Sequence, residues 1–318
     1  MFVAIMATVA AQAQQIAVVS SDGTTTIHRT LADAISKATA NSVIYLPGGG
    51  FPISDEVKID KKLTIIGIGH KVKGDNADGY TTISGNLFFN AGSDGSAVLG
   101  CFITGTLNVG SDGQVNDVLV RYCNLYQINV RRSSCVGVEV NQNYIRYTSW
   151  FNGASVDFTN NIAHSIYNVN NGDISCNIFT SRTSSSGSTS GYTLDAVNSS
   201  KITNNVFLDN NNILPTWNME NCETMNNMSK GTWGDDPIKI EADWSEVFVK
   251  NAGITPMSNF QFTEAYDKYT RQSGIYAGST PFSDGQLPPV PYIVAKQIPE
   301  QTDAEGKLNI KVRVRAGE

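Results

Sequence analysis

The segment EVNQNY, residues 139–144, is one of six similar six-residue segments between Asp117 and Met228. The other five are VRYCNL, DFTNNI, DISCNI, KITNNV and ETMNNM, and aligning all six on one asparagine selects Asn124, Asn143, Asn161, Asn177, Asn205 and Asn227. The intervals between these asparagines are 19, 18, 16, 28 and 22 residues. Similarity that returns at a period near twenty predicts stacked repeats, each in contact only with its neighbours.

A strand pattern precedes each asparagine. Val138 and Val140 occupy alternate positions, as do Val156 and Phe158, which is typical of a strand with one buried face. Asparagine tolerates the left-handed backbone of a sharp bend, and stacked amides can hydrogen-bond to one another. We therefore expect an all-β chain that forms a single-stranded parallel β-helix with an asparagine ladder at one corner. The competing interpretation is a sandwich, whose strands alternate in direction and would not repeat a corner in register.

Composition limits the classes of partner. The chain has 318 residues, of which 16% are charged, with a net charge of −6 and a pI near 5.1. Nucleic acid is not an expected partner, because no basic face would displace its counterions. The sequence contains no later apolar run long enough to span a bilayer.

The N-terminal segment MFVAIMATVAAQA, residues 1–13, is apolar and ends in a small-x-small triplet. It is interpreted as a secretory signal peptide cleaved before Gln14, which predicts a secreted protein of the periplasm, cell surface or medium. The alternative for this segment is a buried strand.

A short amphipathic helix is expected at residues 30–41. Thr30 can cap it, Asp33 follows three residues later, and one apolar stripe is formed by Leu31, Ala34, Ile35 and Ala38. Such a helix would cover the open N-terminal end of the stack, so residues 14–250 are expected to form the β-helix with its cap.

The order of this helix, the strand VIYL, the turn PGGG and the segment LTIIGIG at residues 63–69 resembles the N-terminal entry of the pectate-lyase-like superfamily. The resemblance implies a right-handed parallel β-helix and leaves the activity open. That superfamily includes lyases, hydrolases, epimerases, phage tailspikes, adhesins and proteins without catalysis. The tail, with GIYAGSTPF and LPPVP, resembles the tails of secreted β-helix proteins from Gram-negative bacteria, which implies a bacterial, exported protein.

Two C-terminal parts are expected after the repeats. Residues 251–287 continue an aromatic-rich segment that includes Trp233, Trp244 and Phe248 and is expected to close the second end of the stack. Residues 288–318 read as a proline-rich linker followed by a β-hairpin, because apolar and basic residues alternate between Leu308 and Arg315.

A column of charged side chains is predicted on the solvent-facing side of one sheet. The position four residues before the aligned asparagine is occupied by Glu139, Asp157, Asp173, Lys201 and Glu223. Neighbouring strands lie about 4.8 Å apart, so these carboxylates fall near the separations used by glycosidases. Mutual repulsion would raise the pKa of one of them, or the acids could hold Ca²⁺. The simpler interpretation is that outward positions of a sheet are polar.

Other motifs are weaker. The characteristic pectate-lyase segment is missing, and Gly234-Asp235-Asp236 mimics one polygalacturonase motif without its companions. No metal site or triad can be assembled from the sequence with the three scattered histidines, His28, His70 and His164. Five cysteines make an odd number, so buried thiols are expected rather than a full disulfide framework.

Aromatic residues near the Asn143 corner indicate sugar binding, since sugar faces stack on rings. The candidate substrate-binding residues are Tyr144, Arg146, Tyr147, Trp150, His164 and Lys201, and the candidate catalytic residues are Glu139, Asp157 and Asp173. Two functions follow: a secreted polysaccharide-binding platform without catalysis or a required cofactor, which is favoured, and a polysaccharide lyase or glycoside hydrolase. The glycan, any surface attachment and the oligomeric state stay open.

Overall fold

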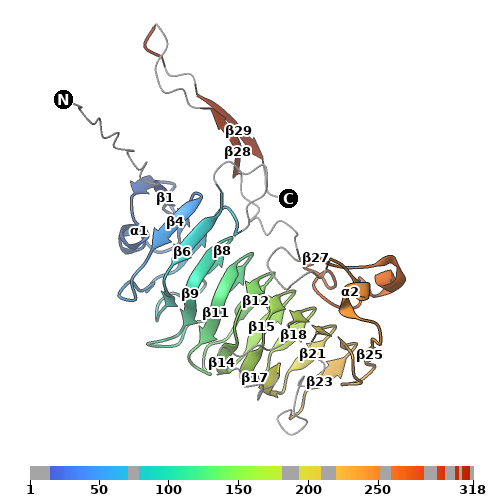
Figure 1. The fold of residues 1–318 in the computed structure, drawn as a ribbon. Helices are drawn as coiled ribbons and strands as arrows, with labels where there is room; N and C mark the ends of the chain where they lie inside the picture. Colours follow the sequence, from blue (N-terminus) through green and yellow to red (C-terminus); the bar gives the residue numbers. More distant parts are fainter. Residues whose placement is uncertain are drawn as a thin grey trace, which may run out of the picture.

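The computed structural model describes residues 15–70, 79–180, 193–208, 220–250, 259–282, 292–297, 305–307 and 310–315. Within these residues the chain is mostly β, with two long sheets and few, short helices (Figure 1). The arrangement is consistent with a parallel β-helix. The expected signal peptide at residues 1–13 lies outside the described residues.

The first sheet has eleven strands, in the order β2-β1-β3-β5-β8-β10-β12-β15-β18-β21-β23. From β3 onward every neighbouring pair is parallel, whereas β1 is antiparallel to both β2 and β3. The strands are β1 (Ile16–Val19), β2 (Thr25–His28), β3 (Ser42–Tyr45), β5 (Leu63–Ile66), β8 (Ala97–Leu99), β10 (Leu119–Arg121), β12 (Val138–Asn141), β15 (Val156–Thr159), β18 (Asp173–Ser175), β21 (Lys201–Thr203) and β23 (Glu223–Met225).

The second sheet has fourteen strands, and all of its pairs are parallel. They are β4 (Gly49–Pro52), β6 (Thr81–Ser84), β7 (Leu87–Phe89), β9 (Phe102–Val109), β11 (Asn124–Val130), β13 (Tyr144–Ile145), β14 (Ser149–Ala154), β16 (Ile162–Ala163), β17 (Ile166–Asn170), β19 (Ile178–Phe179), β20 (Leu194–Asn198), β22 (Val206–Phe207), β24 (Met228–Ser229) and β25 (Ile238–Lys239).

The chain passes from one sheet to the other in every repeat. Strand β12 belongs to the first sheet, while β13 and β14 belong to the second, and β15, β16 and β17 repeat that order. Each of these strands pairs in parallel with its equivalent in the next repeat. Side chains at equivalent positions therefore form columns across the repeats.

The corner between the two sheets has a left-handed residue in each repeat from β8 onward. These residues are Gly100, Tyr122, Gln142, Asn160, Cys176, Asn204 and Asn226, with φ between 53° and 64°. Each lies directly before the residue that turns inward. The prediction that the aligned asparagine itself adopts this conformation was wrong by one position, because the bend and the buried amide are supplied by consecutive residues.

An amide ladder runs along the inside of this corner, as predicted, through Asn143, Asn161, Asn177, Asn205 and Asn227. The Nδ2 atom of each donates to the Oδ1 atom of the next at 3.0–3.1 Å. Each Oδ1 also accepts the backbone N–H of the preceding ladder residue at 2.8–3.1 Å. The amides are fully paired while almost completely buried, so the ladder holds the repeats in register.

The alignment of Asn124 with this ladder was wrong. Asn124 pairs with Tyr144, so the ladder position of that repeat is Cys123, whose N–H donates to Asn143 Oδ1 at 2.9 Å. Cys101 holds the same position one repeat earlier, because Asn124 also pairs with Phe102. The thiols of Cys101 and Cys123 are buried and free, as expected, and burial raises the pKa of the Cys123 thiol to about 12.

The interior between the sheets is filled by the inward side chains of the strands. In the later repeats it becomes a stack of rings: Phe158 lies 6.2 Å from Phe179, which lies 5.2 Å from Phe207. Trp233 meets Phe207 edge-on at 5.4 Å. Of the aromatic residues expected to close the second end of the stack, Trp233 is the one that packs against this interior core.

The N-terminal cap is the helix α1 (Leu31–Lys37). Thr30 Oγ1 accepts the Asp33 N–H at 3.1 Å, and the apolar stripe is buried, as predicted. The helix is shorter than the expected residues 30–41. It ends at Lys37 because Ala38 leaves the helical region, with ψ 138°. Asn41 then turns to φ 65°, and its N–H donates to Lys62 O at 2.7 Å.

The aromatic segment after the repeats packs on the flank of the second sheet. It comprises α2 (Trp244–Val247), β26 (Phe248–Lys250), β27 (Asn259–Phe262) and the 3-10 helix η2 (Glu264–Tyr269). Its rings form a second apolar cluster with Ile162, Ile178, Val206 and Met228. These residues follow the ladder asparagines and point out of the sheet, so their apolar stripe needs a cover. Strands β26 and β27 pair across the boundary expected at residue 250.

A strap, residues 273–280, runs back along the corner. Ser273 Oγ donates to Asn226 O at 3.0 Å and Gly274 N donates to Asn204 O at 2.8 Å. Farther on, Asn160 Nδ2 donates to the carbonyls of Ile275 and Ala277 at 2.9 and 2.8 Å. The strap thus ties three repeats together. After it, β28 (Tyr292–Gln297) and β29 (Lys311–Arg315) form an antiparallel hairpin, as predicted.

Candidate functional site

The charged column predicted for the first sheet lies in register. Glu139 pairs with Asp157, Asp157 with Asp173, Asp173 with Lys201, and Lys201 with Glu223. These side chains alternate with buried Val138, Phe158 and Ile174 along their strands, so they face away from the interior. Neighbouring parallel strands lie about 4.8 Å apart, which places the three acids within mutual repulsion distance.

The environment of the acids differs along the column. Burial raises the pKa of Asp157, and the neighbouring charges of Asp173 and Glu139 raise it further. Asp173 Oδ1 is buried and has no hydrogen-bond partner among the described residues. Asp157 therefore binds a proton more readily than an ordinary aspartate, as a proton donor requires.

A thiol borders this part of the column. Burial raises the pKa of Cys176 to about 11, and the nearby Asp173 carboxylate adds to the rise. An ideal Cβ on Gly278 of the strap would lie 3.1 Å from Cys176 Sγ, so the strap packs closely over the thiol. With such a pKa the thiol stays protonated at neutral pH and is not a nucleophile.

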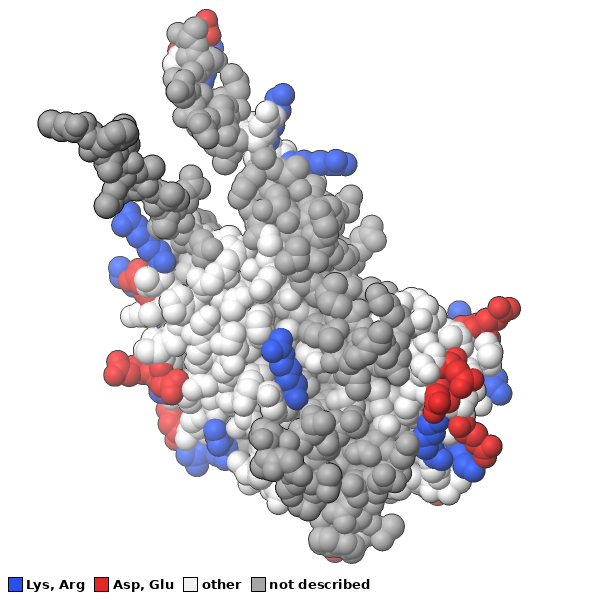
Figure 2. Space-filling model, in the orientation of Figure 1, with Lys and Arg blue, Asp and Glu red and all other residues white. Residues whose placement is uncertain are grey.

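The acids occupy only the later repeats. The same register position in the earlier repeats holds Thr64, Ala97 and Leu119. This register position thus changes from uncharged to acidic residues at Glu139. In Figure 2 most charged side chains in view lie toward the left and right of the body, and one basic side chain stands near its centre among uncharged residues.

Exposed aromatic rings lie on the second sheet. Tyr126 and Tyr147 have ring centroids 4.3 Å apart, and those of Trp150 and Tyr167 are 4.5 Å apart. Tyr126, Tyr147 and Trp150 expose 40%, 38% and 44% of their surface. Tyr126 follows Leu125 in β11, Tyr147 and Trp150 belong to the next repeat, and Tyr167 pairs with Trp150 from the repeat after that. Four rings therefore line three successive repeats.

Arginines lie beside these rings. Arg131 donates to Asn108 Oδ1 through Nε at 3.0 Å and Nη2 at 2.8 Å. Asn108 pairs with Asn129, and Asn129 with Trp150, so this guanidinium lies in the same row as the indole. The Arg146 guanidinium lies 4.7 Å from the Phe102 ring and donates to Asn124 Oδ1 at 3.2 Å.

Two predicted binding residues are set apart from the exposed rings. Tyr144 packs against the second apolar cluster, and burial raises the pKa of its hydroxyl. His164 is 9% exposed, and its Nδ1 lies 3.2 Å from Ser165 Oγ. The predicted residues therefore form two groups, since Lys201 belongs to the column on the first sheet while Arg146, Tyr147 and Trp150 belong to the second. The loop expected to wall a groove, residues 181–192, lies outside the described residues.

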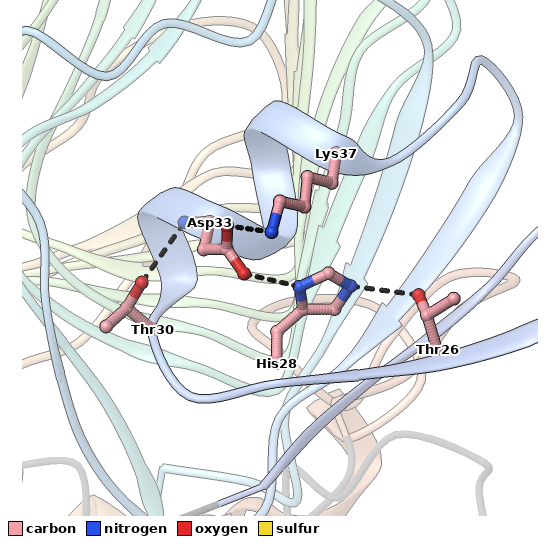
Figure 3. A network of polar contacts seen from close by, with 5 residues as sticks. All are labelled: Thr26, His28, Thr30, Asp33 and Lys37. Atoms are coloured by element: carbon pink, nitrogen blue, oxygen red, sulfur yellow. Dashed lines mark hydrogen bonds and ion pairs between the residues drawn. The ribbon is translucent and has the colours of Figure 1, made fainter.

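His28 is part of a polar chain at the N-terminal cap that sequence reasoning did not assemble (Figure 3). Its Nε2 lies 2.9 Å from Thr26 Oγ1 and its Nδ1 lies 2.7 Å from Asp33 Oδ2, while Lys37 Nζ lies 2.9 Å from Asp33 Oδ1. The order of hydroxyl, imidazole and carboxylate resembles an acyl-transfer relay. Here it joins the outermost strand β2 to helix α1, and the Lys37 ammonium shares the carboxylate.

Within the described residues, no group of three or more His, Cys, Asp or Glu side chains is arranged to hold a metal ion. No helix of this part of the chain is long and apolar enough to cross a membrane. Comparisons with protein-family models, curated proteins and solved structures returned no match.

Proposed function

We propose that this chain is a right-handed parallel β-helix, similar to the pectate-lyase-like superfamily, that is exported and binds polysaccharide without cleaving it. The aromatic pairs Tyr126–Tyr147 and Trp150–Tyr167 are the observation that carries the binding proposal. Exposed rings cost free energy in water unless a ligand covers them, and the apolar faces of sugars are suited to stack on rings.

The spacing of the repeats supports an extended ligand. The two pairs extend over three successive repeats, whose parallel strands β11, β14 and β17 lie about 4.8 Å apart. Asn129 and Asn108 continue the row from Trp150, and Arg131 lies at its end. Asn108 and Asn129 are buried, and Asn108 Oδ1 holds the exposed Arg131 guanidinium in place. Rings would hold sugar faces while this guanidinium binds a carboxylate group, so a linear, acidic glycan fits this row best.

The separation of acids and rings favours binding over catalysis. A glycosidase needs its carboxylates on both sides of the bond between sugars that the rings hold. Glu139, Asp157 and Asp173 lie on the first sheet, whereas the ring pairs lie on the second. A chain stacked on the rings would therefore not reach the acids.

The test is a screen of soluble polyuronides, neutral plant and host glycans by affinity electrophoresis and calorimetry. Binding is expected for wild type and is expected to fall about tenfold for Trp150→Ala, because a central aromatic contact contributes more than 1 kcal/mol. Tyr80→Ala is the matched control, since Tyr80 is 38% exposed and lies outside the two aromatic pairs. Equal binding by Trp150→Ala and wild type would remove the aromatic pairs from the proposal.

A carbohydrate-active enzyme is the second candidate, and the raised pKa of Asp157 between two acids is the observation that favours it. Acids on adjacent strands are about 4.8 Å apart, near the separation of a retaining pair, and acids two strands apart are near that of an inverting pair. The same screen, with and without Ca²⁺, would score new reducing ends and unsaturated products. Product formation that disappears in Asp157→Asn and Asp173→Asn would establish this alternative.

Export is proposed from the sequence of residues 1–13. Expression in a Gram-negative host, followed by mass spectrometry of the N-terminus, tests it. A mature protein that begins at Gln14 in the periplasm or medium is expected. Full-length protein retained in the cytoplasm would contradict export.

A further inference from the structure

We propose that the C-terminal hairpin, β28 and β29, docks on the N-terminal end of a second copy of this chain, against the outer face of β2, β1 and β3. This inference concerns assembly and does not depend on glycan binding. It rests on two exposed apolar surfaces within one chain, neither of which covers the other.

The first surface is one face of the hairpin. Ile310, Val312 and Val314 expose 53%, 51% and 56% of their surface, and they alternate with Lys311 and Arg313. Among the described residues, β28 and β29 pair only with each other. In Figure 1 the hairpin projects away from the body.

A two-stranded hairpin is marginally stable in water without a surface to pack on. Ile310, directly before β29, and Val312 and Val314 within it form an apolar row of β-branched residues, and strand pairing alone does not bury such a row. The hairpin also presents unpaired backbone edges, which proteins normally cover or block. Its apolar face therefore requires a partner surface.

The second surface lies at the N-terminal end of the first sheet. Ile27, Ala17 and Tyr45 occupy paired positions on β2, β1 and β3, so their side chains form one outward row. Ile27 is 56% exposed and Tyr45 is 40% exposed. Strand β2 is the last strand of the sheet order, so this row reaches the open end of the sheet.

A second copy is the occupant that these surfaces favour. Within one chain both apolar rows stay exposed, so the hairpin does not cover the row of Ile27, Ala17 and Tyr45 in its own chain. The strands β28 and β29 contain four basic residues and no acidic one, while the whole chain has a net charge of −6. Without the two strands, the rest of the chain carries a net charge more negative than −6. The acidic body of a second copy therefore attracts the basic hairpin.

The exchange can be reciprocal. The nine residues between Phe282 and Tyr292 span at most about 30 Å when extended, which gives the hairpin reach beyond its own body. Two copies that each receive the other's hairpin would form a closed, two-fold dimer with two identical contacts. The apolar row of β29 would then pack face to face on the row of Ile27, Ala17 and Tyr45.

The test measures the mass of the full chain by sedimentation equilibrium over a range of concentrations. Wild type is expected to dimerise. The double variants Val312→Glu/Val314→Glu and Ile27→Glu/Tyr45→Glu are each expected to weaken dimerisation at least tenfold. Val249→Glu is the matched control, because Val249 is a 57% exposed valine on another strand, β26, and it should leave the mass unchanged.

Mixing the two double variants provides the sharper measurement. Each retains the surface that the other lacks, so a mixture contains one intact contact per pair and should form more dimer than either variant alone. Circular dichroism must show that both variants keep the wild-type sheet signal. Two results overturn the proposal. One is a wild type that stays monomeric at every concentration, and the other is double variants that dimerise as well as wild type.

Discussion

The inside of the corner and the outer faces of the same strands differ in how strongly each position repeats. Inside, five successive repeats place an asparagine at one position, because each buried amide must pair with the next. Outside, the column begins with Thr64 and Ala97 and later holds Asp157 and Lys201. Positions inside the corner thus determine stacking, and the outer positions are free to carry recognition.

The largest expected effect is in the corner. Asn161→Ala removes four hydrogen bonds, with Asn143 N and Nδ2, Val140 O and Asn177 Oδ1. Unsatisfied buried groups cost about 1–3 kcal/mol each, so the free energy of unfolding should fall by roughly 3–5 kcal/mol. Urea unfolding followed by circular dichroism measures it.

Asn124→Ala is the control for that experiment, since Asn124 lies outside the ladder and accepts one hydrogen bond from Arg146. Its cost should be about 1 kcal/mol. If the two variants lose equal stability, the ladder does not have the importance assigned to it.

The next effect is on an outer face. Trp150→Ala should lower glycan affinity about tenfold, close to 1.4 kcal/mol, because it removes a central ring. Its urea midpoint should stay near that of wild type, since the indole is 44% exposed. A large loss of stability without loss of binding would reverse the roles assigned to inside and outside.

A smaller effect concerns the charged column. The pKa of Asp157 is raised in the folded protein, so the folded state binds its proton more tightly than the unfolded state does. This group therefore contributes stability at low pH that is lost as pH rises through its folded pKa. Asp157→Asn should be more stable than wild type at neutral pH by no more than about 1 kcal/mol, because water screens this site.

Thermal unfolding at several pH values tests the sign. The difference between Asp157→Asn and wild type should shrink toward acidic pH. A difference that grows as pH falls would mean that the Asp157 carboxylate is stabilised in the fold.

The smallest effect is at the N-terminal cap. Hydrogen bonds from His28, then Lys37, lower the pKa of Asp33. The contribution of Asp33 is therefore present above its unfolded pKa and is lost as pH falls through its lowered folded pKa. The protection factors of the β2 amides, which correct for the intrinsic exchange rate at each pH, should fall at acidic pH in wild type, and Asp33→Asn should show the lowered protection already at neutral pH. If Asp33→Asn keeps the wild-type protection of the β2 amides, then Asp33 does not hold β2 to helix α1.

Much of the interior pattern could be predicted from the sequence. Valines at alternate positions and the asparagines identified the strands of the first sheet, and Glu139, Asp157 and Asp173 fell in register as expected. Asn124 was misaligned because Cys123 fills the ladder position, and a small buried thiol leaves no amide signal in the sequence.

The outer arrangement was harder to predict. The aromatic segment was expected to close the second end of the stack, but most of its rings pack on the outer stripe formed by Ile162, Ile178 and Val206. The separation of Lys201 from Trp150 could not be read from spacing alone, because it depends on which strand of each repeat enters which sheet. The chain from Thr26 to Asp33 was missed because a turn and a helix bring its members together.

The strap changes how the molecule must come apart. In a stack of repeats each unit is stabilised mainly by its neighbours, so an array can unravel from either end one unit at a time. Here Asn160 is bonded to Ile275 and Ala277, more than a hundred residues later in the chain. The last repeats cannot separate from the stack until these hydrogen bonds between Asn160 and the strap break, so unfolding from this end should be cooperative. During synthesis these hydrogen bonds can form only after the earlier repeats have formed and the chain has grown past residue 280.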